Sequence, residues 1–138
     1  MNEEIREAIF TKVGTVLSGT SVEYENQPFN REGLSEWVRV SILDGTGFNA
    51  TMGRTKKIKQ PGILVCEIFA VRGTGTKATR QTADTIADGF RNVQLSEGST
   101  TVDFINPTMA NGDDGDPNYY RQIVNCEFLA QDTKSDAT

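Results

Sequence analysis

The sequence contains no histidine and only two cysteines, and both facts limit its chemistry. Without histidine, the chain lacks the side chain that most often acts as a general base near neutral pH, which is also the commonest metal ligand. Histidine triads and zincin-type metal sites are therefore excluded. Cys66 and Cys126 each lie in an apolar, strand-like stretch. We expect two small buried side chains with free thiols, with a disulfide as the alternative, and no zinc site.

Long apolar runs and an excess of positive charge are also missing. No uninterrupted apolar run exceeds the four residues Ile63 to Cys66, whereas a membrane-spanning helix needs about 20. The net charge is −5, the wrong sign for general binding to nucleic acids or anionic membranes. Residues 1–6 lack the basic and apolar regions of a secretory signal, so a cytosolic origin is expected.

The chain is long enough for one domain, since it has 138 residues and domains cluster near roughly 100–150. We predict a single domain over residues 1–130 and a polar, disordered tail over residues 131–138. Apolar residues recur at spacings of three and four over residues 3–18, which predicts a helix. The same spacing in Ala83, Ile86 and Phe90 predicts a second helix.

Strand patterns fill most of the remaining chain. Residues 36–43 alternate between two faces, as in a half-buried strand. Ile63 to Val71 is apolar on both faces apart from Glu67, which predicts a strand in the middle of a sheet. Asp44-Gly45 is expected to turn the chain back, and residues 55–62 are expected to form an exposed basic connection. Further strands are predicted over 22–24, 48–54, 100–105 and 119–129.

The order of these elements predicts the fold class. Several strand pairs are joined by turn-like segments rather than by helical crossovers. We therefore expect an α+β domain with a mainly antiparallel sheet and two helices packed on one face.

Two glycine-rich segments resemble binding loops without matching their patterns. The turn around Gly73 and Gly75 lacks the Gly-Lys-Ser/Thr of a Walker A loop and the third glycine of a Rossmann fingerprint. The acidic loop that contains Asp113 would place Val124 where an EF-hand needs a bidentate glutamate. No catalytic, cofactor-binding or metal-binding residue is assigned on these grounds.

A basic stretch is the strongest candidate for an interface. It concentrates four positive charges in an otherwise acidic chain: Arg54, Lys56, Lys57 and Lys59. A solvated loop is one interpretation. The other is an electrostatic contact, and because no aromatic residue is interleaved to stack on bases, a protein partner is favoured over DNA. The complementary charge within this chain lies in the acidic loop, at Asp113, Asp114 and Asp116.

The order of several features resembles a known family. The features are an amphipathic N-terminal helix, the Pro28-Phe29 loop, Trp37-Val38-Arg39-Val40, a basic stretch ending in Gly62-Ile63-Leu64-Val65, the Gly73-Thr74-Gly75 turn, Ala83-Asp84 with Ile86-Ala87 and Phe90, and Tyr119-Tyr120 before a long strand. Over residues 1–130 the chain is similar to the tail terminator proteins of long-tailed bacteriophages, such as that of phage lambda.

The resemblance implies a structural virion protein rather than an enzyme. A small α+β subunit would form a hexameric ring that caps the tail tube, stops its growth and meets the connector of the head. Its partners would be other copies of itself, the tail tube protein and neck proteins, with no cofactor, no membrane and no specific nucleic-acid binding, although genome DNA would pass through the ring. It would lie at the neck-proximal end of a siphovirus tail, and in the host cytoplasm during assembly. The alternatives are a neck or head–tail completion protein and, from another class, a small ligand-binding or enzymatic phage protein.

Overall fold

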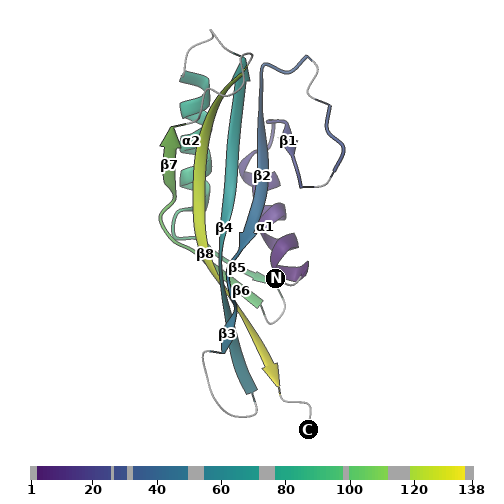
Figure 1. Ribbon diagram of the computed structural model, residues 1–138, viewed down its shortest axis with the longest axis vertical. Coiled ribbons are helices and arrows are strands. Elements are labelled where there is room, and N and C mark those ends of the chain that lie inside the picture. The colour runs from purple at the N-terminus through teal and green to yellow at the C-terminus, as the bar shows by residue number, and fades with distance from the viewer. Residues whose placement is uncertain are drawn as a thin grey trace.

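The computed structural model describes residues 3–25, 27–30, 33–49, 55–71, 77–97, 100–111 and 119–135. These residues form two helices and eight strands (Figure 1). In chain order the elements are α1 (Glu3–Val16), β1 (Val22–Glu23), β2 (Glu36–Asp44), β3 (Phe48–Asn49), β4 (Thr55–Val71), α2 (Lys77–Phe90), β5 (Gln94–Glu97), β6 (Thr100–Phe104), β7 (Thr108–Asn111) and β8 (Tyr119–Ser135).

All eight strands belong to one sheet. Its order is β1-β2-β4-β8-β6-β5, with β3 beside β4 and β7 beside β8. The β1–β2 pair is parallel and every other pair is antiparallel. The predicted α+β class with a mainly antiparallel sheet is therefore confirmed. So is the central place of the apolar 63–71 stretch, which lies in β4 between β2 and β8.

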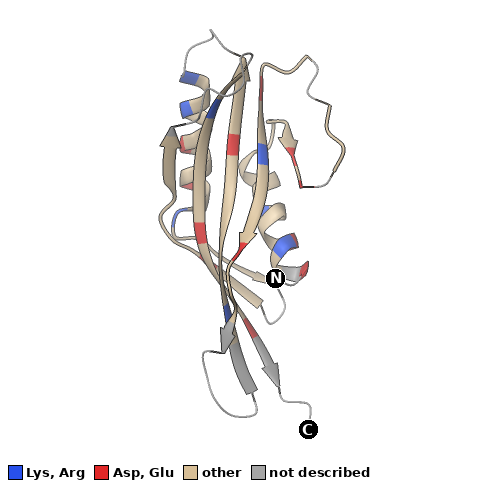
Figure 2. Ribbon diagram, in the orientation of Figure 1, with Lys and Arg blue, Asp and Glu red and all other residues tan. Residues whose placement is uncertain are grey.

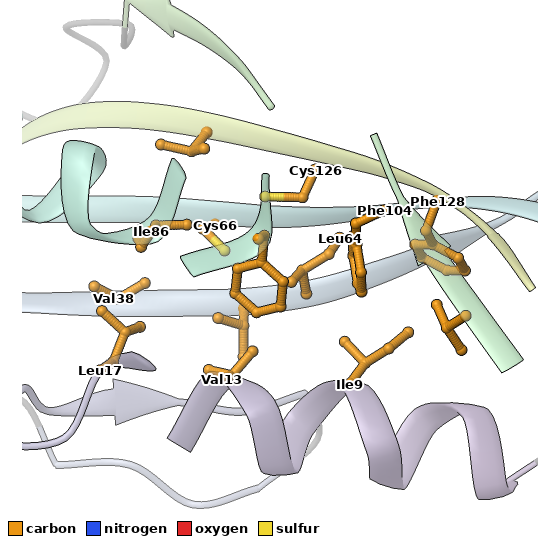
Figure 3. Close-up of a cluster of buried hydrophobic side chains, with 14 of the residues drawn as sticks. Ile9, Val13, Leu17, Val38, Leu64, Cys66, Ile86, Phe104, Cys126 and Phe128 are labelled. Atoms are coloured by element: carbon orange, nitrogen blue, oxygen red, sulfur yellow. The ribbon is translucent and has the colours of Figure 1, made fainter. Parts of the chain in front are cut away.

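Both helices cover the same face of the sheet, as predicted. Figure 3 shows Ile9 and Val13 of α1, and Leu17 directly after this helix, pointing toward the sheet. Ile86 and Phe90 of α2 belong to the same buried cluster. From the sheet, this core receives alternate side chains of the long strands: Val38, Val40, Leu64, Cys66, Ile68, Val124, Cys126 and Phe128. The face of the sheet opposite the helices is called the open face below.

The two cysteines are buried in this core as free thiols, as the sequence predicts. The two cysteines lie diagonally across neighbouring strands, because Leu64 pairs with Cys126 and Cys66, two residues further along β4, pairs with Val124. A hydrogen bond with Cys126, together with burial and the neighbouring thiol's charge, raises the pKa of Cys66 well above its usual value. Both cysteines therefore act as small apolar core residues.

The prediction that the chain turns back at Asp44-Gly45 is wrong. β2 and β3 both run antiparallel to β4 and do not pair with each other, so the chain keeps its direction through residues 45–47. A two-residue hairpin turn needs glycine at positive φ. Among the described glycines only Gly19 and Gly33 have positive φ. The Gly45 N–H instead donates a hydrogen bond of 2.8 Å to the Pro61 carbonyl of β4.

The prediction that residues 55–62 form an exposed connection is also wrong, because β4 runs without a break from Thr55 to Val71. Proline inside a strand usually argues against the strand, since it cannot donate to the ladder. Pro61 is tolerated because it lies between the part of β4 that pairs with β2 and the part that pairs with β3. β2 pairs from Gly62 onward and β3 pairs with Lys59 and Ile58.

The last strand is longer than expected. β8 continues to Ser135, so residues 131–135 are paired with β4 and are not part of a disordered tail. Their polar composition gives no strand pattern in the sequence, and their pairing with β4 shows the strand. β5 and β7, each four residues long, are too short to give a clear alternation and were not predicted. In the described parts of the chain, no helix is long and apolar enough to cross a membrane.

Candidate interaction surface

The open face carries an aromatic cluster at the end where β8 begins. Trp37 is completely buried, and its ring stacks on Phe69 with centroids 5.0 Å apart. Tyr119 meets Trp37 edge-on at 4.8 Å, and Phe29 lies on it from the preceding loop at 6.5 Å. Trp37 is therefore a packing residue at this end of the sheet.

Charged residues border this cluster. Arg121 of β8 forms an ion pair with Glu67 of β4 at 3.0 Å, and both side chains are partly buried. Arg39 of β2 donates a hydrogen bond of 3.2 Å to Glu23, and its guanidinium lies 4.9 Å from the centre of the Phe69 ring. These contacts satisfy the charges within the chain and cover the apolar rings at this end of the open face.

At the other end, the open face forms a shallow apolar groove of about 400 Å³. Its floor follows from the register: Leu43 pairs with Ile63, which pairs with Glu127, and in the next row Pro61 pairs with Leu129. Ile105 closes one side, with its N–H bonded to the Glu127 carbonyl at 3.2 Å. We refer to this feature as the groove.

Two side chains of the groove are unusually exposed for their type. Leu43 is 56% exposed and Ile105 is 52% exposed, and both are among the few large apolar side chains on the surface of the described residues. Asp44 and Glu127 also line the groove. Figure 2 shows acidic positions on β2 and β8, the strands that border it. A contiguous exposed apolar surface with a polar rim is typical of a protein-binding site.

A two-stranded extension leaves the body of the protein beside the groove. Residues 55–59 of β4 pair with 131–135 of β8, and β3 pairs with the other edge of β4. Figure 1 shows this extension, here called the ribbon, projecting beyond both helices. Among the described residues, β8 beyond Gln131 has β4 as its only strand neighbour. Backbone pairing therefore joins the strands of the ribbon.

The predicted interface residues divide between the ribbon and segments outside the described residues. Lys56 and Lys57 lie in the ribbon strand of β4, opposite Lys134 and Thr133. Lys59 lies at its base, half-buried, opposite Phe48 and Gln131. Arg54, Asp113, Asp114 and Asp116 lie outside the described residues, as does the glycine-rich turn at 73–75. The proposed contact between the basic stretch and the acidic loop stays a prediction.

None of the groove residues was predicted from the sequence as an interface residue. Leu43 carried a signal, since it continues the alternation of Trp37, Arg39 and Ser41 on one face of a strand. Asp44, Ile105 and Glu127 carried none, because they meet only through strand pairing. Within the described ranges, no cluster of three or more Cys, Asp or Glu side chains has the arrangement of a metal site.

Comparison with known proteins identifies the family of this chain. A family model described as phage tail terminator protein matches residues 4–125. The sequence matches no curated protein. Thirteen chains of solved structures match in fold. One of them, which carries no functional description, has a TM-score of 0.68 and 15% identity, over 99% of this chain and 97% of its own. At that identity the likeness shows the fold alone.

The fold defines a small α+β protein with an exposed apolar groove on one face of its sheet. The family match covers most of the chain, so the protein belongs to the phage tail terminator family. It is accordingly a structural protein of a phage tail.

Proposed function

We propose that this protein is the tail terminator itself: a ring of like copies, six as the family resemblance implies, that caps the tail tube at its neck-proximal end. The observation that carries the proposal is the family match over residues 4–125. A groove and a ribbon on one subunit support it, since a ring needs two unlike faces that meet head to tail.

The mechanism requires no bond-breaking chemistry. Tube subunits order themselves on the exposed end of the growing tube, and a ring that covers this end removes the template. Growth therefore stops by steric occlusion. One end of the ring then covers the tube, and the other meets the connector or neck proteins of the head. The protein needs no cofactor and has no enzymatic activity in this role.

Tail length tests the proposal. Phage particles made without this protein should carry tails longer than normal and should fail to join heads, as measured in negative-stain micrographs. Purified protein added before overgrowth should restore both length and joining. A matched control is addition of the protein after overgrowth, which should leave the tails long.

Other results would assign the protein differently. Tails of normal length that do not join heads would instead identify a neck or head–tail completion protein. Normal length together with normal joining would rule out both roles. Binding of a nucleotide or of calcium by the monomer, measured by calorimetry, would support a ligand-binding or enzymatic protein.

A further inference from the structure

The groove is apolar at its centre and acidic along one edge. More than half of the Leu43 and Ile105 side chains is in water. Glu127 lines the groove, and Asp103 lies beside it because it pairs with Leu129, two residues along β8 from Glu127. Both neighbours of Asp103 in β6 belong to the core, so its side chain points to the open face. Residues placed diagonally in this way are about 7–8 Å apart.

These two carboxylates keep their charge exposed. Glu127 and Asp103 are both exposed, and neither forms an ion pair with another residue in the described parts of the chain. Lys59 lies on the same face, two residues before Pro61, but is half-buried. It pairs with Gln131 of β8, one row further along, so β8 separates it from Asp103.

The complementary charge lies in the first turn of α2. Lys77 and Arg80 are exposed there, and this turn contains no acidic residue. Figure 2 shows the positive charge at the start of this helix. Neither cation forms an ion pair with a described residue. Because the backbone dipole is already positive at the start of a helix, carboxylates from outside stabilise this turn.

The two surfaces also match in spacing and shape. Lys77 and Arg80 are three residues apart on a helix, which places their Cβ atoms about 5–6 Å apart, close to the separation of the two carboxylates. The methylene stems of lysine and arginine cover apolar surface while their charged ends reach further. Ala78 between them is exposed and small, so the helix can approach an apolar floor closely.

Within one chain these surfaces cannot meet, because α2 covers the face of the sheet opposite the groove. A contact between them therefore joins two copies. It also joins them front to back, since each copy presents its open face to the helix layer of the next.

We propose that the first turn of α2 in one copy binds in the groove of the next copy of this chain, with Lys77 and Arg80 facing Glu127 and Asp103. Such a head-to-tail contact closes into a ring when the rotation permits. The inference rests on the proposed function, for which it names the surfaces that join neighbouring subunits.

Site-specific cross-linking tests this contact directly. One variant carries Ala78→Cys, which leaves both cations in place, and a second, of distinguishable mass, carries Ile105→Cys. A short bis-maleimide should join the two variants when they are mixed, giving a heterodimer by mass spectrometry. Thr15→Cys is the matched control, since Thr15 is exposed on α1, the other helix of the same layer. It should give no heterodimer with Ile105→Cys. The native cysteines are buried and do not compete.

Charge exchange provides the second measurement. The helix variant K77E/R80E and the groove variant D103K/E127K should each self-associate about tenfold more weakly than the unaltered chain, in sedimentation at low salt. An equimolar mixture should recover association, because copies that alternate around a ring of six meet opposite charges at every contact.

A control separates this contact from the effect of net charge. The variant E3K/E7K changes the net charge by the same amount as D103K/E127K, at two exposed positions of α1. It should associate like the unaltered chain. Circular dichroism checks that all variants are folded.

Three results would overturn the inference: a chain that stays monomeric at its highest soluble concentration, equal cross-linking of positions 78 and 15 to position 105, or a mixture no stronger than its components. A ring that assembles without the cross-link between positions 78 and 105 would refute this contact alone. The terminator role would then still be decided by tail length.

Discussion

Gly62 lies directly against the ring of Phe128. A Cβ atom built on Gly62 would lie 2.5 Å from Phe128 Cζ and 3.0 Å from the Leu43 carbonyl oxygen. Phe128 is buried and packs on Phe104 with ring centroids 5.4 Å apart, so it has little room to move. The glycine therefore lets three strands approach closely where the groove meets the core.

Gly62→Ala is expected to destabilise the protein by about 1–3 kcal/mol, because the added methyl group overpacks this contact. Urea denaturation followed by circular dichroism measures the change. Gly47→Ala is the matched control: the nearest atom outside its chain neighbours would be 3.7 Å from the new Cβ, an ordinary contact. Equal effects of the two substitutions would show that the close approach at Gly62 is not a constraint.

The aromatic cluster on the open face is expected to contribute strongly to stability. Trp37→Ala removes a fully buried ring that contacts Phe69 and Tyr119, and should cost about 3–5 kcal/mol. Trp37→Phe keeps a stacked ring and should lose clearly less. The measurement is again the free energy of unfolding in urea. A loss under about 1 kcal/mol for the alanine variant would contradict the assigned packing.

Glu25 is expected to protect the edge of β2. Its carboxylate accepts a hydrogen bond from the Ile42 N–H and lies 3.8 Å from the Arg6 guanidinium of α1. Glu25→Ala should lower stability by about 1–2 kcal/mol and leave an unpaired edge N–H that promotes association of sheets. Light scattering on heating measures that association. Glu25→Gln keeps an acceptor oxygen and should behave more like the unaltered protein.

The buried thiols predict how stability changes with pH. Because the pKa of Cys66 is raised in the folded state, the folded protein holds its proton at pH values where the unfolded chain releases it. Stability should therefore be unaffected by this group below the unfolded-state pKa of about 8.5 and fall above it, by at most about 1.4 kcal/mol per pH unit. Cys66→Ala should remove this slope. Burial also raises the pKa of Tyr24, which adds a similar slope at higher pH.

The same burial predicts that both cysteines stay reduced in the native protein. They should react with Ellman's reagent only after unfolding, and the intact mass without added oxidant should be that of the dithiol. A native mass lower by two hydrogens would show a disulfide and contradict the free thiols in the structure.

Much of the fold could be predicted from the sequence because the relevant patterns are local. The apolar spacing of Ile5, Ile9 and Val13 marks a helix wherever it lies in the chain, and α1 covers Glu3–Val16. The 63–71 stretch is apolar apart from Glu67 and needs cover on both faces, which places it centrally in a sheet. Cys66 and Cys126 each have apolar neighbours in the sequence, which likewise predicted buried thiols.

The candidate site could be predicted only in part. The basic stretch was recognised by its charge, but its form was not: Lys56, Lys57 and Lys59 belong to a strand rather than to a loop. Pro61 and Gly62 are ordinary turn residues in sequence, and only the gap between β2 and β3 explains why a strand continues through them. Nothing in the sequence around Asp44, Glu127 or Ile105 indicates that these residues line a groove.

By itself, the sequence determined which segments are helical, which strand is central and which residues avoid water, since these depend on residues two, three or four positions apart. Tertiary structure alone decided that the chain keeps its direction after Asp44 and that polar residues 131–135 extend a strand. It also brought Leu43, Ile105 and Glu127 together in one groove. These outcomes depend on which distant strand supplies the hydrogen-bonding partner, and backbone pairing is the same for every residue that can donate and accept.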